Sequence, residues 1–515
     1  METVNKSNSN DSENTEIMRN VSKQIFLNAL SCPVLGWVSR CDENFRAELT
    51  LGERFRMEQG VEVGRRARSL YPGGRLTSPN MSVALEETKR ALADASVPVV
   101  FEGAFLIDGF AARADVLERT DEGWHLVEVK SATNDRDDFI DDMAYTTMVT
   151  SKCGLNICRV SLLLVSRDYR LGMPDEKLFV EIDHTDEVLQ RVEELEPVWQ
   201  EIEEITRAPI MPEPQLIYDC RQCELFGECV GKDIKNHLFN LPRLNEARFD
   251  ALLALGINRV EDIPEGFSLT EYQARVTDCV RRNETFIGEG LRDELSTIKW
   301  PAYYLDFETV MTAIPLYPDI APYTQIPTQY SIHRCPEVGV IDGHFEYLAD
   351  PVRDCREELA QNLISDLGEE GSIIAYSNFE KAVINSLARL FPDLSDRLLD
   401  LTDRIVDLEA IIRRNYYHPD FCGSTSVKRT YPVMASEMTS DIFEITDIDL
   451  IPVLVPEMSY DDLAIGDGDS ASAAFAYMAL GKDPDPETTK RNLLEYCKLD
   501  TLAMVRLHQR LDDIA

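Results

Sequence analysis

Two carboxylates stand two residues apart in the apolar stretch AYYLDFETV, residues 302–310. Such a stretch is typical of a buried strand, in which alternate residues share a face, so Asp306 and Glu308 should project together. Burying two carboxylates among aromatic neighbours is costly unless cations neutralise them. Because carboxylate oxygens are preferred ligands of Mg²⁺ and Mn²⁺, the spacing predicts a divalent metal site.

Two later segments carry further groups of the same kind. Residues 371–391 have the pattern of a buried strand, a turn and an amphipathic helix, and Glu380 lies at the start of that helix. Residues 492–511 have a strong helical pattern. Their Tyr496 and Asp500 are four residues apart, so both should lie on one face of the helix.

A second acidic group lies in ARADVLERTDEGWHLVEVKSA, residues 112–132. Alternating stretches flank the turn signal TDEG, which predicts a β-hairpin. With a two-residue loop at its tip, Asp115 lies opposite Glu128, and Lys130 shares their face. The two carboxylates, Asp115 and Glu128, can hold Mg²⁺. The lysine can orient a water and stabilise charge on a phosphorus centre. A surface hairpin with cross-strand ion pairs explains the same residues equally well.

Clustered cysteines form a third group. The stretch DCRQCELFGEC has the spacing C-x2-C-x5-C, with thiols at Cys220, Cys223 and Cys229. Three thiols are one short of a four-ligand metal site, and the candidates for the fourth are Cys32 and Cys41. Four thiolates suit Zn²⁺ or an iron–sulfur cluster equally, so the metal stays open. The remaining cysteines are scattered and are predicted to be small buried residues.

The elements that must position these groups indicate a multi-domain α/β protein. A chain of 515 residues suits three or four regions at about 100–200 residues per domain. We expect a disordered tail at 1–20, a mixed domain at 21–235, a helical linker at 236–295 and an α/β domain at 296–515.

The last region resembles the DEDD exonucleases of the RNase H-like fold, in the subclass that carries a tyrosine. The matching motifs are D-x-E on the first strand, an acid after a later strand and Y-x-x-x-D on the last helix. The resemblance implies two Mg²⁺ or Mn²⁺ ions, a water oriented by Tyr496 and removal of nucleotides from a 3′ end. It implies four metal ligands: Asp306, Glu308, Glu380 and Asp500. Glu380 departs from the family, which usually has Asp there.

The first domain resembles the RecB-type branch of the PD-(D/E)XK nucleases, which have a restriction-endonuclease-like α/β/α core. The motif that carries the resemblance is Asp115 followed by Glu128 and Lys130, with a helix on either side of the hairpin. SKQIFLNALSCPVLGWVSR, residues 22–40, is similar to the opening of the iron–sulfur members. In those proteins one early and three late cysteines bind a 4Fe-4S cluster. Cys32 takes the early position, which implies a clasp closed by Cys220, Cys223 and Cys229.

Two departures leave activity at this first site open. Where the family has G-x-x-x-H, the chain has Gly60 followed by Gly64. Where the family has a glutamine and an aromatic residue on the next helix, DDMAYTTMV offers Tyr145 and Thr146. Glu58 or Glu62 could compensate for the missing histidine.

Three further features have two interpretations each. Residues 244–276 loosely resemble a helix-hairpin-helix element, but a helical spacer between two nuclease domains is favoured. The loop at 416–432 could bind a strand through Lys428, Arg429, Tyr416 and Tyr417, or could simply be solvent-exposed. Asp407 falls where such folds often carry an acid, and we predict a structural role for it.

The composition limits which molecules the protein can bind and where in the cell we expect it. The net charge of −40 opposes non-specific binding to nucleic acid, so any binding groove must be locally basic or bridged by metal. No signal peptide and no membrane-spanning run are visible, which predicts a cytoplasmic protein with reduced thiols.

Residues 296–515 resemble a family of predicted exonucleases that couples these two domains, so the resemblance covers nearly the whole chain. We therefore predict a nuclease acting on DNA, on single strands or 3′ ends, in repair or in defence against foreign DNA. The alternatives are an RNA exonuclease whose first domain only binds, and a nucleic-acid-binding scaffold with decayed sites. The sequence does not identify protein partners.

Overall fold

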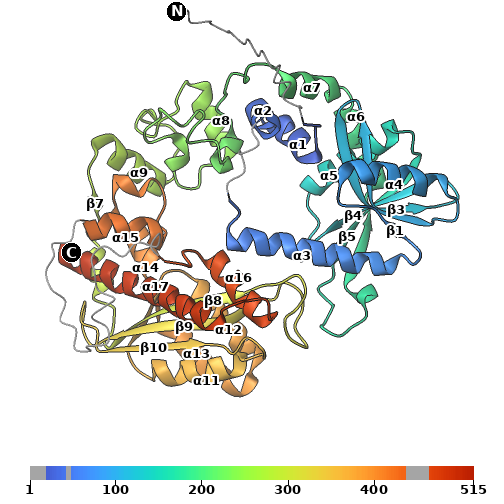
Figure 1. The fold of residues 1–515 in the computed structure, drawn as a ribbon. Coiled ribbons are helices and arrows are strands. Elements are labelled where there is room, and N and C mark those ends of the chain that lie inside the picture. Colours follow the sequence, from blue (N-terminus) through green and yellow to red (C-terminus); the bar gives the residue numbers. More distant parts are fainter. Residues whose placement is uncertain (1–18, 42–47, 437–462) are drawn as a thin grey trace, which may run out of the picture.

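The protein is described by a computed structural model that covers residues 19–41, 48–436 and 463–515 (Figure 1). The predicted tail lies outside the described residues except for its last two positions. Sheets and covering helices alternate along the rest of the chain, so the prediction of a mixed α/β, multi-domain fold is confirmed. No helix in the described ranges is both long and apolar enough to cross a bilayer.

The N-terminal body is built on a six-stranded sheet in the order β1-β2-β3-β4-β5-β6. The β1–β2 and β4–β5 pairs are parallel and the other pairs are antiparallel. The strands are β1 (Arg75–Leu76), β2 (Val99–Ile107), β3 (Phe110–Arg119), β4 (Trp124–Lys130), β5 (Ile157–Val165) and β6 (Phe179–Asp183).

Helices cover both faces of this sheet. They are α1 (Lys23–Ser31), α2 (Pro33–Cys41), α3 (Leu51–Ala67), α4 (Met81–Ala93), α5 (Asp138–Lys152), α6 (Thr185–Leu195) and α7 (Trp199–Arg207). One face packs under α1, α4, α5, α6 and α7, around Phe26, Met143 and Trp199. The C-terminal end of α3 covers the other face, where Ala67 packs against Val116 and Val127.

The predicted hairpin is β3–β4. The backbone N–H of Thr120 donates to the carbonyl of Gly123 at 2.9 Å, which closes the two-residue loop. Val116 then pairs with Val127, and the same register places Asp115 opposite Glu128.

Residues 236–295, the predicted helical linker, pack against the C-terminal region. They contain α8 (Glu246–Ala254), α9 (Glu271–Arg282), β7 (Phe286–Ile287) and α10 (Leu291–Leu295). Phe249 and Val276 share one hydrophobic core with Tyr304 and Val505 of the C-terminal region. Strand β7 also pairs with β13 (Tyr416–Tyr417). This middle segment therefore belongs physically to the C-terminal body, because its apolar side chains are buried there.

The C-terminal sheet has the order β10-β9-β8-β11-β12. Strands β10, β9 and β8 are antiparallel, whereas β11 is parallel to both β8 and β12. The strands are β8 (Ala302–Val310), β9 (Ile326–Cys335), β10 (Gly343–Leu348), β11 (Ser372–Ala375) and β12 (Ile405–Asp407). The helices are α11 (Arg356–Leu367), α12 (Phe379–Leu390), α13 (Ser395–Asp403), α14 (Leu408–Asn415), α15 (Val427–Ser436), α16 (Gly468–Ala479) and α17 (Pro486–Ile514).

Side chains of β8 alternate between two different cores. Tyr303, Leu305 and Phe307 pack under α11, α12 and α13. Tyr304 faces the opposite side, where α17 lies. Because the side-chain period of a strand is two, Asp306 and Glu308 also face α17.

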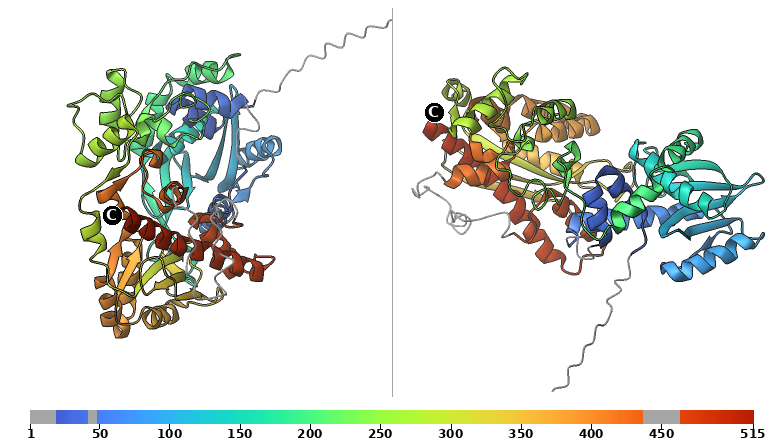
Figure 2. Two further views of the ribbon diagram at one scale, coloured as in Figure 1. Left: turned by 90° about the vertical axis from the view of Figure 1, so that its left-hand side faces the viewer. Right: turned by 90° about the horizontal axis from the view of Figure 1, so that it is seen from above.

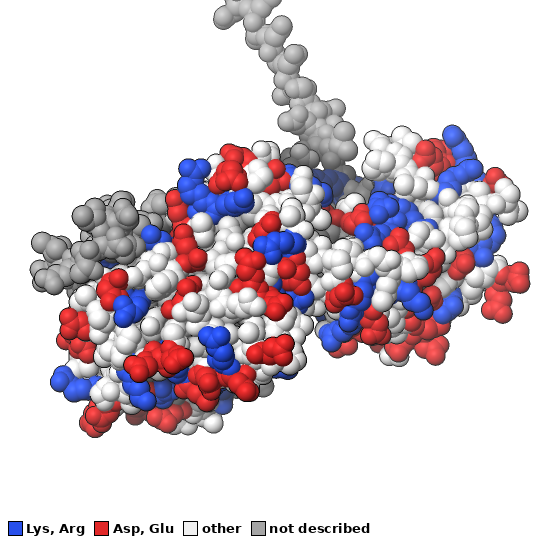
Figure 3. Space-filling view, turned by 90° about the horizontal axis from the view of Figure 1, so that it is seen from below, with Lys and Arg blue, Asp and Glu red and all other residues white. Residues whose placement is uncertain are grey.

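The two bodies meet along α3, which lies between them in Figure 1, and Figure 2 shows the same two bodies from two further sides. Phe55 of α3 joins a hydrophobic cluster with Phe475 of α16. Glu58 accepts hydrogen bonds from Tyr477 and Lys482, both at 3.1 Å. Acidic and basic side chains are interspersed over the face of the molecule drawn in Figure 3.

Candidate active sites

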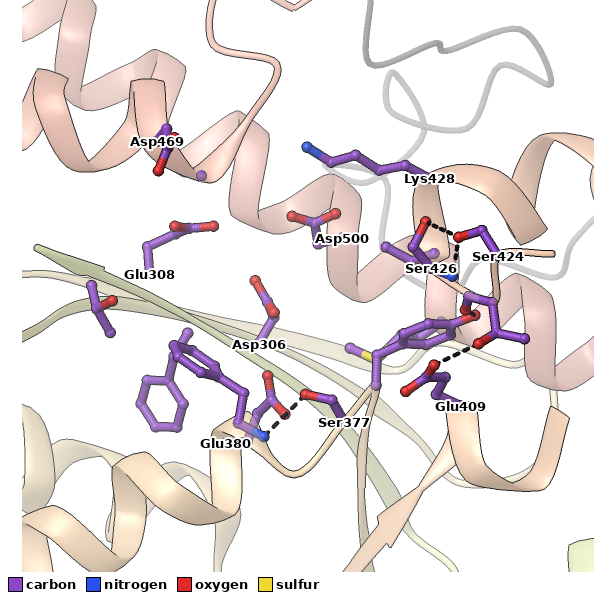
Figure 4. Close-up of a pocket in the computed structure, with 18 of the residues that line it drawn as sticks. Asp306, Glu308, Ser377, Glu380, Glu409, Ser424, Ser426, Lys428, Asp469 and Asp500 are labelled. Carbon is purple, nitrogen blue, oxygen red and sulfur yellow. Dashed lines mark hydrogen bonds between the residues drawn. The ribbon is translucent and has the colours of Figure 1, made fainter. Parts of the chain in front are cut away.

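The C-terminal site brings together carboxylates from three elements around a cavity of about 770 Å³. Asp306 and Glu308 come from β8 and Asp500 from α17, and one oxygen from each lies within 4.8 Å of the other two. Glu380, in the first turn of α12, lines the same cavity but is not part of this close group. Figure 4 shows the four carboxylates around the cavity.

These carboxylates are poorly compensated by protein charge. Among the described residues no ion pair involves Asp306 or Glu308. Burial, followed by the charge of Asp500, raises the pKa of Asp306 well above its usual range. The same two causes raise the pKa of Glu308 to about 8, against the opposing charge of Lys428. Burial raises the pKa of Glu380 to about 7.

The donor set fits a hard divalent cation. Three carboxylate oxygens that lie within 4.8 Å of one another could converge on one Mg²⁺ or Mn²⁺ ion, because these hard cations prefer oxygen ligands. Glu380 is 3% exposed, and its Oε2 has no hydrogen-bond partner among the described residues. A buried carboxylate oxygen without a donor is the state that a cation would relieve.

Tyr496 lies beside these carboxylates on the same face of α17. It lines the cavity, and burial followed by the charge of Asp500 raises its pKa. The Lys428 ammonium lies 5.2 Å from the centre of the Tyr496 ring. The thiol of Cys497, which the sequence did not single out, donates to Asp306 Oδ2 at 3.5 Å.

The other residues predicted near this site have different positions. Lys428 lines the cavity, but Tyr416 and Tyr417 are fully buried and cannot stack on a strand. Arg429 donates to the carbonyl of Phe421 at 3.4 Å. Asp407 caps α14 by accepting from the backbone N–H of Ala410 at 2.8 Å, which is a structural role.

The N-terminal site has a different electrostatic balance. Glu128 accepts a hydrogen bond from Lys23 at 2.6 Å and lies 3.0 Å from the Lys130 ammonium. Burial alone would raise the pKa of Glu128, but the two lysines outweigh it and lower the pKa to about 2. Lys130 also pairs with Asp142 of α5. Sequence spacing could not reveal Lys23, because it lies far from Glu128 along the chain.

Asp115 faces a cavity of about 370 Å³ beside this lysine cluster. It accepts from the backbone N–H of Val129 at 2.8 Å, yet burial and then the charge of Glu128 raise its pKa to about 8. Glu102 lines the same cavity from a left-handed position in β2 (φ 55°), where β2 skips one pairing opposite Asp115. Sequence reasoning missed Glu102, because its position depends on this irregularity.

The expected compensations do not occur around this cavity. Gly60 and Gly64 both line it, and a Cβ at either position would meet open space. Glu58 bonds to Tyr477 and Lys482, and Glu62 bonds to Arg65 and Arg66, so neither replaces the family's histidine. Tyr145 is buried, and its hydroxyl donates to the carbonyl of Val21 at 2.8 Å instead of facing the cavity. Thr146 donates to the carbonyl of Asp142.

The four predicted cysteine ligands gather at one place. Cys32 ends α1, and the neighbouring Ser31 donates to Asp219 of the cysteine-rich loop at 3.1 Å. Burial raises the pKa of Cys220, and its other causes include the nearby thiols of Cys32, Cys223 and Cys229. Cys41 instead donates to the carbonyl of Thr206 at 3.7 Å. Of the remaining cysteines, Cys279, Cys335, Cys355 and Cys497 are buried.

The clustering of these four thiols does not distinguish between two metal groups. Thiolate sulfur is a ligand of tetrahedral zinc and of iron–sulfur clusters alike. The choice between them belongs to the metal content of the purified protein.

Comparisons with known proteins give one family profile and two similar solved structures. A family profile described as "Domain of unknown function (DUF2779)" matches residues 303–426. No curated protein matches the chain. The chain is similar to the crystal structure of an alkaline exonuclease (LHK-Exo) from Laribacter hongkongensis, and to that of LHK-Exo in complex with dAMP. In both comparisons the identity is 17%, the match covers 36% of this chain and 92% of the exonuclease chain, and the TM-score is 0.20.

Proposed function

We propose that the protein is a metal-dependent nuclease whose C-terminal cavity removes nucleotides from the 3′ end of a DNA strand. The observation that carries this proposal is the convergence of Asp306, Glu308 and Asp500 within 4.8 Å. It is supported by the strand order, three antiparallel strands followed by two parallel ones, which is the order expected of an RNase H-like domain.

In this proposal the chain's own groups have separate tasks. Asp306, Glu308, Asp500 and Glu380 hold Mg²⁺ or Mn²⁺, which when bound neutralises the scissile phosphate and lowers the pKa of a coordinated water. Tyr496 keeps its phenolic proton, because burial and Asp500 raise its pKa, and donates it in a hydrogen bond that orients the attacking water. Lys428 faces Glu308 and adds positive charge near the phosphate.

The N-terminal cavity is a second candidate nuclease site. Asp115 and Glu128, with Glu102 on the same cavity as Asp115, would hold a cation, and Lys130 would stabilise charge on the phosphate. Lys23 and Lys130 already neutralise Glu128, which favours weaker metal binding here than in the C-terminal cavity. A domain that binds nucleic acid without cutting it fits this balance as well.

A hydrolysis assay on one variant of each cavity shows which of the two cavities carries the activity. Purified protein with Mn²⁺ should shorten a single strand of DNA labelled at its 5′ end, releasing mononucleotides. Asp306→Ala should abolish this activity, and Lys130→Ala should leave most of it. Intact DNA under all salt and metal conditions would favour a non-catalytic scaffold. Faster loss of a matched RNA strand would favour the RNA exonuclease. Activity that survives Asp306→Ala but not Lys130→Ala would place the reaction in the N-terminal cavity.

We further propose that the four clustered cysteines bind a 4Fe-4S cluster that acts as a clasp. It would tie the end of α1 to the loop at 220–229, closing the N-terminal body around Asp115 and Glu128. Anaerobically purified protein should then contain iron and absorb broadly near 400 nm. Cys32→Ser should remove most of this absorbance, and the control Cys41→Ser should keep it. Zinc without iron, and no such band, would contradict the cluster.

A further inference from the structure

One wall of the C-terminal cavity comes from the middle segment. Pro242, Arg243 and Tyr272 line the cavity together with Asp306 and Asp500. None of these three residues belongs to the motifs that mark the acidic site. The cavity thus has an acidic floor from the sheet and α17, and a wall with basic and aromatic side chains from a separate part of the chain.

The wall is held in a fixed and unusual backbone conformation at Arg243. This residue has φ 51°, in the left-handed region that a residue with a Cβ rarely adopts. Gln273, which is 2% exposed, holds the adjoining carbonyl of Pro242 by donating to it at 2.8 Å. Its oxygen accepts from the Thr270 N–H at 3.1 Å. Backbone strain that a buried side chain maintains is characteristic of binding sites.

A second arginine of the cavity is positioned from the same segment. Arg413, at the end of α14, lines the cavity. Arg275 of α9 donates to the carbonyl of Arg413 at 3.1 Å and to that of Arg414 at 2.6 Å. The Arg275 guanidinium in turn stacks over Phe286 at 4.3 Å. Helix α9 therefore sets the position of Arg413 as well as that of Arg243.

The loop on the other side of the wall is locked to it. Gly423 lines the cavity and has φ 82°, and a Cβ there would lie 2.0 Å from the carbonyl oxygen of Asn240. Only glycine permits this approach, because any side chain would collide with backbone. The hydroxyl-rich loop Ser424, Thr425 and Ser426 continues the cavity lining from this contact toward Lys428.

The arginines of the wall carry positive charge that the described residues leave largely unpaired, which suits a polyanionic ligand. Arg243 is exposed, and in the described part of the chain it has no hydrogen bond or ion pair. Arg413 has one long contact, 3.9 Å to Glu409. The buried hydroxyl of Tyr272 has no partner among the described residues, and both arginines lower its pKa against the effect of burial. Two guanidinium groups, one unpaired among the described residues and one with a single long ion pair there, therefore line the cavity beside a tyrosine in a protein of net charge −40.

We propose that the middle segment and the end of α14 form the strand-binding wall of the nuclease cavity, in which Arg243 and Arg413 bind backbone phosphates of single-stranded DNA and Tyr272 contacts a base. This inference rests on the proposed function, because the acidic floor must hold the scissile phosphate. The phosphates that follow the scissile one then meet the arginines, which bind phosphate oxygens without reading sequence. Stacking on tyrosine is likewise tolerant of sequence.

Removing the arginines of the wall should slow the hydrolysis of a long strand but not that of a minimal substrate. Thymidine 5′-(p-nitrophenyl phosphate) has one phosphodiester and no further phosphate, so it reports the acidic floor alone. A 20-nucleotide single strand of DNA needs both parts of the cavity. The variants are Arg243→Gln and Arg413→Gln. The matched control is Arg282→Gln, which removes an exposed arginine of the same segment that does not line the cavity.

Hydrolysis with Mn²⁺ and strand binding in Ca²⁺ are measured for each protein. For Arg243→Gln and Arg413→Gln we expect kcat/KM on the 20-mer to fall about tenfold, with the rate on the minimal substrate kept within about twofold. In fluorescence anisotropy, the slope of log Kd against log salt should fall by about one per arginine removed. Arg282→Gln should match the wild type in all three measurements, and circular dichroism verifies that every variant is folded.

The outcomes separate this inference from the proposed function. A wild type that cleaves neither substrate overturns the proposed function, and weaker strand binding by the arginine variants alone would still support the wall. If Arg243→Gln and Arg413→Gln hydrolyse and bind the 20-mer as well as the control Arg282→Gln does, the inference of a strand-binding wall is wrong. Equal loss on both substrates also overturns it, because the arginines would then act on the reacting phosphate itself.

Discussion

Tyr496 is the residue whose role can be tested with the smallest change. Its ring lies among the carboxylates of the C-terminal cavity, and only its hydroxyl could orient a water. We expect Tyr496→Phe to lower kcat on single-stranded DNA by about 10–100-fold with KM nearly unchanged, because the ring and its packing remain.

The control for this variant is Tyr477→Phe. It removes a hydroxyl that bonds to Glu58 at 3.1 Å and that does not line the cavity. Steady-state kinetics of both variants would decide the matter. A Tyr496→Phe enzyme as fast as the control would show that the hydroxyl has no part in the reaction.

The raised pKa values of Glu308, about 8, and Glu380, about 7, predict a pH dependence for the metal-free protein. Between about pH 5 and pH 8 the folded protein holds protons that the unfolded chain has released. The free energy of unfolding should therefore fall as the pH rises through this window. Thermal unfolding in EDTA at a series of pH values measures this slope, and Glu308→Gln should make it shallower.

Metal should act in the opposite direction over the same window. Mg²⁺ or Mn²⁺ needs deprotonated carboxylates, so the rise in Tm on adding metal should grow from pH 5 to pH 8. A metal-induced rise that is the same at every pH, or that persists in Glu308→Gln, would place the bound metal elsewhere.

At the scale of the elements, the loop that begins at Gly423 packs closely against Asn240 of the middle segment. Gly423→Ala would force a Cβ against the carbonyl of Asn240. We expect it to reduce the free energy of unfolding by about 2–4 kcal/mol. Gly481→Ala is the control, since it has a similar φ of 66° with no atom within 4 Å, and should cost about 1 kcal/mol. Urea unfolding compares the two, and equal losses would show that the contact with Asn240 is dispensable.

The parts of the site that depend on local periodicity could be predicted from the sequence. A two-residue spacing on a strand puts Asp306 and Glu308 on one face, and a four-residue spacing on a helix does the same for Tyr496 and Asp500. The hairpin register of β3 and β4 followed from its turn. These relations need no knowledge of the rest of the fold.

The parts that depend on packing between distant segments could not be predicted. Lys23 reaches Glu128 only because α1 packs beside the sheet. Arg243 and Tyr272 reach the acidic cavity because the middle segment buries its apolar side chains in the C-terminal core. The packing of the middle segment could not be predicted for the same reason, since a helical pattern shows which face is apolar but not what covers it.

In the whole molecule, the N-terminal and C-terminal bodies share apolar surface as well as hydrogen bonds. Phe55 of α3 is 5% exposed, and its ring lies 5.2 Å from that of Tyr477. We expect Phe55→Ala to separate the unfolding of the two bodies into two calorimetric transitions, because it removes a large apolar contact between them. Val61→Ala, at a position of the same helix that is 73% exposed, should leave the calorimetric trace unchanged. A single transition in both variants would show that the bodies unfold together without this contact.

Helix α3 lines the N-terminal cavity and binds a helix that contributes to the lining of the C-terminal cavity. Gly60 and Gly64 line the N-terminal cavity, and Glu58 binds α16, whose Gly468 lines the C-terminal cavity. Each residue of a helix adds about 1.5 Å and turns the chain by about 100°. One residue inserted between Glu58 and Gly60 would swing the glycines away from Asp115 and let larger side chains enter the cavity. The length of this stretch therefore fixes where the two glycines lie relative to α16, and an insertion would alter the lining of the N-terminal cavity without any change of side chain.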